Sequence, residues 1–179
     1  MKLFTFALLL TLLIISMQGC SGAGPKTAQN GNASNWSYTE KQDKMGRGVI
    51  KAATTASSNT VAFNFPGNVP QQARLTLRNH PQEGGEVIFS VVKSQFLSTG
   101  YRKKVLVRFD DRPPIIFYAD EPADNSTDTV FIDDYQKFCA NLRHAKKVMI
   151  EAQFYQEGGR IFEFNVGGLD WDAFNISKP

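Results

Sequence analysis

The sequence predicts a mainly β domain, an antiparallel sandwich or barrel-like fold with one amphipathic helix, that follows an N-terminal signal peptide and a flexible tether. Three observations lead to this prediction. Apolar and polar side chains alternate through most of the chain, and turn-forming residues recur about every 8–12 residues. A single segment, after Asp133, changes to a helical spacing. The alternating segments indicate about eight to ten short strands.

The first 19 residues have the pattern of a secretory signal. Lys2 supplies a positive charge, an apolar run covers Leu3–Ile15, and the small residue Gly19 precedes Cys20. The apolar run is shorter than the roughly 20 residues that a membrane-spanning helix needs. We therefore expect a cleaved signal rather than a permanent transmembrane segment.

Cys20 and the three residues before it resemble the lipobox of bacterial lipoproteins, although Met17 and Gln18 replace the usual Leu and Ala. The resemblance implies that Cys20 becomes the lipidated first residue of the mature protein. Two or three acyl chains hold stably, because each buried methylene contributes about 0.8 kcal/mol. Ser21 follows where Asp favours the inner membrane, so the resemblance implies the outer membrane with the domain in the periplasm. The alternatives are an uncleaved anchor and a soluble exported protein cut near Gly22 or Ala23.

The segment 20–35 has no large apolar side chain and is expected to be a flexible tether that carries the lipidated Cys20. The β-rich globular domain is expected over residues 36–174, which is an ordinary size for one domain.

The first half of this domain contains four alternating segments. They are Trp36–Thr39, Val61–Phe65, Ala73–Arg78 and Glu86–Lys93, and each is expected to form a strand. Residues 40–59 are polar and mixed, and they predict no element.

The second half contains five more expected strands. Val105–Phe109, Val148–Gln153 and Arg160–Val166 alternate, and Thr129–Ile132 is short. Pro114–Ala119 is apolar on both faces, which is typical of a central strand.

A helix is expected over Asp133–Ala145. Its apolar stripe follows the i, i+3, i+4, i+7 spacing, and Asp133 with Gln136 resembles a capping box. Cys139 falls on this stripe and is expected to be a buried, small apolar residue. Because Cys20 would be acylated, Cys139 has no intrachain disulfide partner.

Neither charge nor motifs point to catalysis or to nucleic acid. The formal net charge is only +3, and basic and acidic residues are mixed, which argues against a nucleic-acid partner. His80 and His144 lie in unrelated segments, and Ser90 and Lys93 would point to opposite faces of a strand. We therefore predict no catalytic residue, no metal site and no cofactor.

The expected contact surface consists of charged residues in the turns around the Pro114–Ala119 strand. Loops on a rigid sheet are where binding residues concentrate. Such a string of carboxylates could hold Ca²⁺, but no D-x-D-x-D-G spacing is present, and Asp is also the residue that turns require. The residues are Arg108, Asp110, Asp111, Asp120, Asp124 and Asp128.

Most of the domain also resembles an uncharacterised family of small exported proteins of gammaproteobacteria. The resemblance lies in V-x-V-R-F-D-D-x-P over Val105–Pro113, in Thr129–Ile132, and in the Phe- and Gly-rich pattern of Val148–Trp171. Many members carry a cysteine pair near Ser98 and Lys104, which this chain lacks. The family implies export and a β fold, and it names no activity.

These observations predict a membrane-anchored periplasmic lipoprotein that acts as a non-enzymatic binding or envelope-protection module. Its expected partners are the membrane, through the lipid, and another envelope protein or a glycan. The alternative is a peptidoglycan- or glycan-directed hydrolase. That alternative requires Asp110, Asp111 and either His80 or His144 to line one deep pocket.

Overall fold

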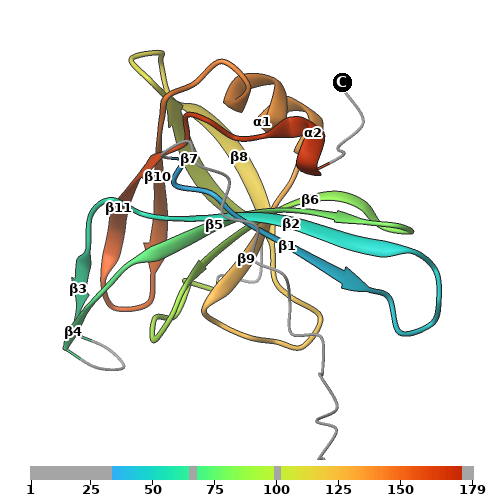
Figure 1. The fold of residues 1–179 in the computed structure, drawn as a ribbon. Coiled ribbons are helices and arrows are strands. Elements are labelled where there is room, and N and C mark those ends of the chain that lie inside the picture. Colours follow the sequence, from blue (N-terminus) through green and yellow to red (C-terminus); the bar gives the residue numbers. More distant parts are fainter. Residues whose placement is uncertain (1–33, 65–67, 99–101, 175–179) are drawn as a thin grey trace, which may run out of the picture.

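The structure is a computed structural model that describes residues 34–64, 68–98 and 102–174. Cys20, the signal segment 1–19 and most of the expected tether lie outside the described residues. Within the described part, no helix is long and apolar enough to cross a membrane. The domain is mainly β with a small helical part, which confirms the predicted fold class (Figure 1).

Nine strands form one antiparallel sheet in the order β1-β2-β5-β6-β9-β8-β7-β10-β11, and β3 pairs with β4 in a second, small sheet. Helix α1 follows β9, and the single-turn α2 follows β11. The strands are β1 (Ser37–Gln42), β2 (Val49–Ala56), β3 (Val61–Phe63), β4 (Val69–Gln71), β5 (Ala73–His80), β6 (Gly84–Val91), β7 (Lys103–Phe109), β8 (Ile115–Asp120), β9 (Thr129–Ile132), β10 (Lys147–Phe154) and β11 (Gly158–Asn165), and the helices are α1 (Tyr135–Leu142) and α2 (Trp171–Phe174).

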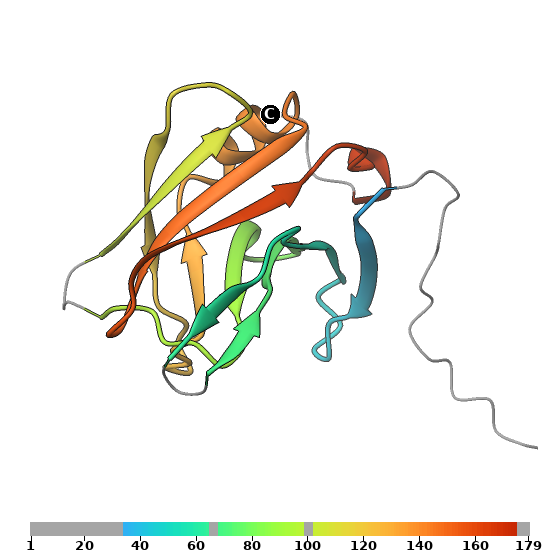
Figure 2. The same cartoon turned by 90° about the vertical axis from the view of Figure 1, so that its left-hand side faces the viewer.

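The sheet curls into a sandwich-like form without closing as a barrel (Figure 2). Among the described residues, no strand pairing joins β1 to β11. Side-chain hydrogen bonds and one backbone hydrogen bond instead connect the segment after β2 to β11 on this open side. The Asn59 amide accepts the N–H of Glu163 at 2.8 Å and donates to the C=O of Ile161 at 3.0 Å. The N–H of Ser58 donates to the C=O of Glu163 at 2.7 Å.

Most of the largest fully buried side chains of the core are phenylalanines. Alternate side chains of each strand point inward, and the rings meet edge to face or stacked, as aromatic quadrupoles favour. Phe63 and Phe154, for example, have ring centroids 4.9 Å apart. The fully buried rings are Phe63, Phe89, Phe109, Phe138, Phe154, Phe162 and Phe164. The periodicity of the sequence therefore identifies the core correctly.

Helix α1 lies where the apolar stripe predicts it, but the expected cap is wrong. The N-cap is Asp134, at φ 54°, and its carboxylate accepts the N–H of Lys137 at 3.2 Å. Asp133 is the last residue before that cap and pairs with Arg102. The helix packs on β6 because Gly85 has no side chain: a Cβ there would lie 2.3 Å from the Tyr135 ring.

Two strands were not predicted from the sequence. β2 lies inside the polar stretch 40–59, where its buried positions are the small residues Ala53 and Thr55. β4 contains Pro70 in its three residues, and it pairs only with β3. Neither strand has the alternation of large apolar and polar residues that identifies the others.

The N-terminal end of the described chain is bonded to the segment after β11. Ser34 Oγ donates to the C=O of Gly168 at 3.0 Å, and the Trp36 indole donates to the C=O of Val166 at 3.0 Å. The Tyr38 hydroxyl accepts the N–H of Asp170 at 2.7 Å. The folded domain therefore includes Ser34, two residues before the expected boundary at Trp36.

Candidate functional site

The charged residues of the expected contact surface do not form one site. Arg108, Asp110 and Asp111 lie at the turn between β7 and β8, whereas Asp120 ends β8. In the β7–β8 ladder Val107 is opposite Ile115 and Lys103 is opposite Ala119, so the two groups flank opposite ends of β8. The physical reason is that consecutive turns of an antiparallel meander alternate between the two ends of the strands.

The Asp110 carboxylate forms hydrogen bonds within the domain, so it is not a free contact group on the surface. It has a positive φ of 49°, and its Oδ1 accepts the N–H groups of Lys146 and Lys147 at 2.9 and 2.8 Å. These bonds, first the one from Lys147, hold the pKa of the Asp110 carboxyl below its usual value. At the same turn, Asp111 is fully exposed and lies 3.3 Å from the Arg108 guanidinium.

The acidic residues after β8 are also engaged locally. Asp120 pairs with Arg102 at 3.3 Å. Asp124 accepts the N–H and the hydroxyl of Ser126 at 3.0 and 2.7 Å, and these two bonds lower the pKa of its carboxyl. Asp128 accepts a hydrogen bond from the hydroxyl of the next residue at 3.0 Å. Throughout the part of the chain that the structure describes, no three His, Cys, Asp or Glu residues are grouped as metal ligands.

A patch of outward-facing side chains that the sequence pattern did not predict as a site lies on the outer face of β8, β7, β10 and β11. Ile116 of β8 is directly opposite Leu106 of β7, which is opposite Glu151 of β10, which is opposite Ile161 of β11. Residues directly opposite in antiparallel strands share a face of the sheet. With Tyr118, two positions further along β8, these five residues form what we call the outer patch.

The outer patch exposes large side chains that a core would normally hold. Ile116, Tyr118 and Ile161 are 54%, 44% and 43% exposed. They lie on the face opposite the phenylalanine core, because β8 points Phe117 and Ala119 inward. The apolar pattern on both faces of Pro114–Ala119 was the sequence signal for this patch. It indicates a central strand correctly, but no element of the described part of the chain covers the outer side chains of that strand.

The charges around the outer patch have both signs. Glu151 is half-buried at its centre and makes no ion pair within the described residues. Lys104 and Arg108 lie on either side of Leu106 along β7 and share its face. The Arg102 guanidinium stacks over the Tyr118 ring, 5.4 Å from its centroid. The outer patch therefore combines exposed apolar side chains with a central carboxylate and cations at its border, and apolar groups rimmed by charges are common in protein contact surfaces.

A cavity of about 420 Å³ lies where β10 separates from β7. Beyond Glu151, β10 no longer pairs with β7, and the N–H of Leu97 donates to the C=O of Gln153 at 2.9 Å instead. Apolar side chains line the cavity beside basic ones. The lining residues are Phe96, Leu97, Arg102, Lys103, Lys104, Val105, Ala152 and Gln153.

The groups considered for catalysis are separate from this cavity. His80 is buried, and its Nδ1 accepts the N–H groups of Gln82 and Glu83 at 3.4 and 3.3 Å. His144 is exposed after the end of α1. Burial raises the pKa of the Cys139 thiol to about 12, so it is not a nucleophile at neutral pH.

Comparisons with known proteins add little to this geometry. No protein-family model matches the chain. No curated protein matches it either. Among solved structures, invasion associated protein B from Bartonella henselae is similar at 12% sequence identity with a TM-score of 0.45, over 77% of this chain and 89% of that one. A likeness of this size carries no argument about the function of the chain.

Proposed function

We propose that this chain is a lipoprotein of the bacterial outer membrane, held by acyl chains on Cys20, whose domain faces the periplasm. We further propose that it is a non-enzymatic module that binds an envelope partner, a protein or a glycan, through the outer patch. The observation that carries the binding proposal is a row of outward-facing residues across four adjacent strands, in which the apolar side chains of Ile116 and Tyr118 on β8 and of Ile161 on β11 are exposed.

The membrane anchor rests on the order of residues at the N-terminus. A charged start, a short apolar run and a Gly19-Cys20 pair are the features that lipoprotein signals share. The bonds from Ser34 and Trp36 to the chain after β11 lie at the domain end of the expected tether. They would give a tether that starts at Cys20 a fixed point of attachment to the domain.

The binding role rests on what the outer patch would gain from burial. Contiguous exposed apolar surface on a soluble domain marks a contact surface more often than chance. Ile116 and Tyr118 lie on a rigid central strand, so they lose little conformational freedom on binding. Glu151 would add specificity, because burying it requires a hydrogen-bond donor or a cation on the partner.

Among the residues that the structure describes, no arrangement of side chains supports the hydrolase alternative. The Asp110 carboxylate is occupied by two backbone N–H groups, and Nδ1 of His80 by two others. Asp111 and His144 are not among the residues that line the cavity. We therefore propose binding rather than hydrolysis.

The anchor is tested by metabolic labelling with palmitate. We expect label in the unaltered protein and none in Cys20→Ser, and we expect only the unaltered protein to fractionate with the outer membrane. Label-free protein, or identical fractionation of the two forms, would contradict the anchor.

The outer patch is tested by site-specific photo-crosslinking in the native envelope. A photoreactive residue at Ile116 or Ile161 should give a discrete crosslinked species, and one at Val92, which is similarly exposed outside the patch, should not. Ile116→Lys should abolish the crosslink from position 161 while the unfolding midpoint stays the same. Equal crosslinking from position 92 would rule out the outer patch as the contact surface.

A further inference from the structure

We propose that the turn between β1 and β2 is a lipid-contacting tip, which inserts Met45 into the surface of an anionic bilayer. The inference rests on the proposed lipid anchor and goes beyond it, because it assigns a second membrane contact. Three features of the described residues carry it: a rigid turn, an exposed apolar side chain at its apex, and cations without partners.

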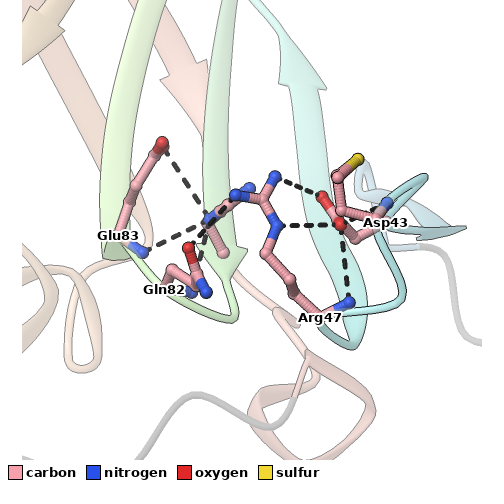
Figure 3. A network of polar contacts seen from close by, with 6 residues as sticks. Asp43, Arg47, Gln82 and Glu83 are labelled. Carbon is pink, nitrogen blue, oxygen red and sulfur yellow. Dashed lines mark hydrogen bonds and ion pairs between the residues drawn. The ribbon is translucent and has the colours of Figure 1, made fainter.

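The turn is rigid because the buried carboxylate of Asp43 accepts several hydrogen bonds from other residues of the turn. Asp43 accepts the N–H of Met45 at 2.8 Å and two bonds of 2.9 Å from the Arg47 guanidinium (Figure 3). Arg47 also donates to the side chain of Gln82, on the turn between β5 and β6, at 3.1 Å. Gly48 packs against Pro81, where an added Cβ would lie 3.1 Å away. The turn is therefore fixed to its neighbour.

Met45 is the apolar group at the apex of this turn. It is 77% exposed, the largest exposure of any large apolar side chain among the described residues. Its own N–H is bonded to Asp43, so the backbone beneath it is held while the side chain projects. Methionine is unbranched and flexible, and it adapts to irregular apolar surroundings such as acyl chains.

The charge at the turn favours an anionic surface. Lys41 and Lys44 are exposed, and neither has an ion-pair partner within the described residues. Two of the nearby carboxylates are paired, Asp43 with Arg47 and Glu40 with Lys51. The remaining acid is Glu83 on the neighbouring turn, 3.8 Å from the His80 ring. Cations beside an exposed apolar group are the usual features of a membrane-surface contact.

The shape of the turn favours lipid over protein as the occupant. A protein interface buries about 800 Å² on each partner, which needs a broad surface, whereas this tip is the narrow end of one hairpin beside the β5–β6 turn (Figure 1). The anchor would also keep the tip within reach. The chain from Cys20 to Ser34 could span at most about 50 Å if fully extended, and β1 adds roughly 20 Å between Trp36 and the turn.

The test uses the intact lipoprotein in vesicles of phosphatidylethanolamine and phosphatidylglycerol, with an environment-sensitive fluorophore on Met45→Cys. The buried thiol of Cys139 does not compete for the label. The matched control is Val69→Cys, which is exposed on β4 at the other side of the sheet (Figure 1). We expect a lipid-borne quencher to reduce emission at least twofold more at position 45 than at position 69. Lys44→Glu in the same background, or phosphatidylcholine vesicles, should remove most of this difference.

Each outcome separates the tip from the anchor. Protein that does not float with the vesicles overturns both proposals. Protein that floats, with equal quenching at positions 45 and 69, overturns the tip alone and leaves the anchor in place. The fluorophore at position 45 could instead be shielded from water in native envelope vesicles but not in protein-free vesicles. That result would show that the tip contacts a protein, and it would also overturn the lipid proposal.

Discussion

Asn59 holds the open side of the curled sheet through both ends of its side-chain amide. One end accepts the N–H of Glu163, and the other donates to the C=O of Ile161. Removing the amide leaves both backbone groups of β11 without these bonds, and each such loss costs about 0.5–1.5 kcal/mol. We expect Asn59→Ala to lower the free energy of unfolding by about 1–3 kcal/mol, measured by urea denaturation.

The matched control for that experiment is Asn35→Ala. Asn35 makes a single, longer bond of 3.4 Å to the C=O of Asn165 and is exposed. Its replacement should change the free energy of unfolding by less than about 0.5 kcal/mol. Equal losses in the two variants would show that the Asn59 amide does not hold the sheet together.

Asp43 makes the stability of the domain depend on pH. The Arg47 guanidinium first, and then backbone N–H groups, hold the pKa of its carboxyl well below the ordinary value. The unfolded chain, with an Asp pKa near 3.9, therefore takes up the proton more readily. The stabilisation is complete above about pH 5 and is lost as the pH falls below 4 toward the lowered pKa.

We expect Asp43→Asn to be less stable than the unaltered chain at pH 7 and to approach it at low pH. The measurement is the free energy of unfolding by urea at several pH values between 2 and 7. Asp111→Asn, which removes a fully exposed carboxylate, is the control and should follow the unaltered chain. Parallel pH profiles for Asp43→Asn and the unaltered chain would contradict the assigned role.

The aspartates also show why the candidate site was only partly predictable. Asp110, Asp124 and Asp134 all accept backbone N–H groups of turns or caps. In a sequence, an aspartate that accepts hydrogen bonds from a turn cannot be distinguished from one that binds a ligand. The expected contact surface therefore did not separate the two kinds. Among the six expected residues, Arg108 lies beside the outer patch, and the others serve turns, ion pairs or solvent.

At the scale of elements, α1 depends on a position in β6 that has no side chain. An added Cβ at Gly85 would lie 2.3–2.6 Å from three atoms of the Tyr135 ring. The ring is half-buried and would have to move together with the helix. Overpacking of this kind typically costs about 1–3 kcal/mol, so we expect Gly85→Ala to lower the melting temperature by several degrees.

Gly167→Ala is the control for Gly85→Ala, because a Cβ at Gly167 would meet nothing within 4 Å. The double variant Gly85→Ala with Tyr135→Ala should recover part of the loss that the clash causes. If Gly85→Ala melts at the same temperature as the Gly167 variant, Gly85 is not needed for the seating of α1.

The elements differ in how well the sequence predicts them, and the reason is side-chain size. Strands such as β10 and β11 alternate large apolar with polar residues and were identified within a few positions. β2 was missed because its inward residues, Ala53 and Thr55, are small. For α1, the apolar stripe locates the helix, whereas its first residue depends on the left-handed backbone of Asp134, which no spacing indicates.

At the scale of the whole molecule, Cys139 reports the integrity of the fold. Burial raises the pKa of its thiol to about 12. At pH 8 roughly one thiol in ten thousand would be ionised, and the folded chain also excludes reagents. We expect no reaction with a maleimide in the native protein and complete reaction in 6 M guanidinium, followed by mass spectrometry. Rapid labelling of the native protein would show that the core opens locally near α1.

The same measurement counts thiols in the unfolded chain. The sequence contains two cysteines, so acylation of Cys20 leaves one reactive thiol per chain, and a chain that keeps Cys20 without acylation has two. Chains from a strain without lipoprotein acylation should therefore gain one labelled site. Equal counts from both strains would contradict acylation at Cys20.

The bonds from Ser34 and Trp36 to the chain beyond β11 decide how the domain responds to being pulled. A load on the tether meets these bonds before it reaches β1. The load is thus transferred to the segment after β11, at the opposite end of the sheet. The hydrogen bonds between β1 and β2 are then not broken one residue pair at a time. Under the proposed lipid anchor, a pull from the membrane would act on the bonds of Ser34 and Trp36 first, and the outer patch would keep its shape while these bonds hold.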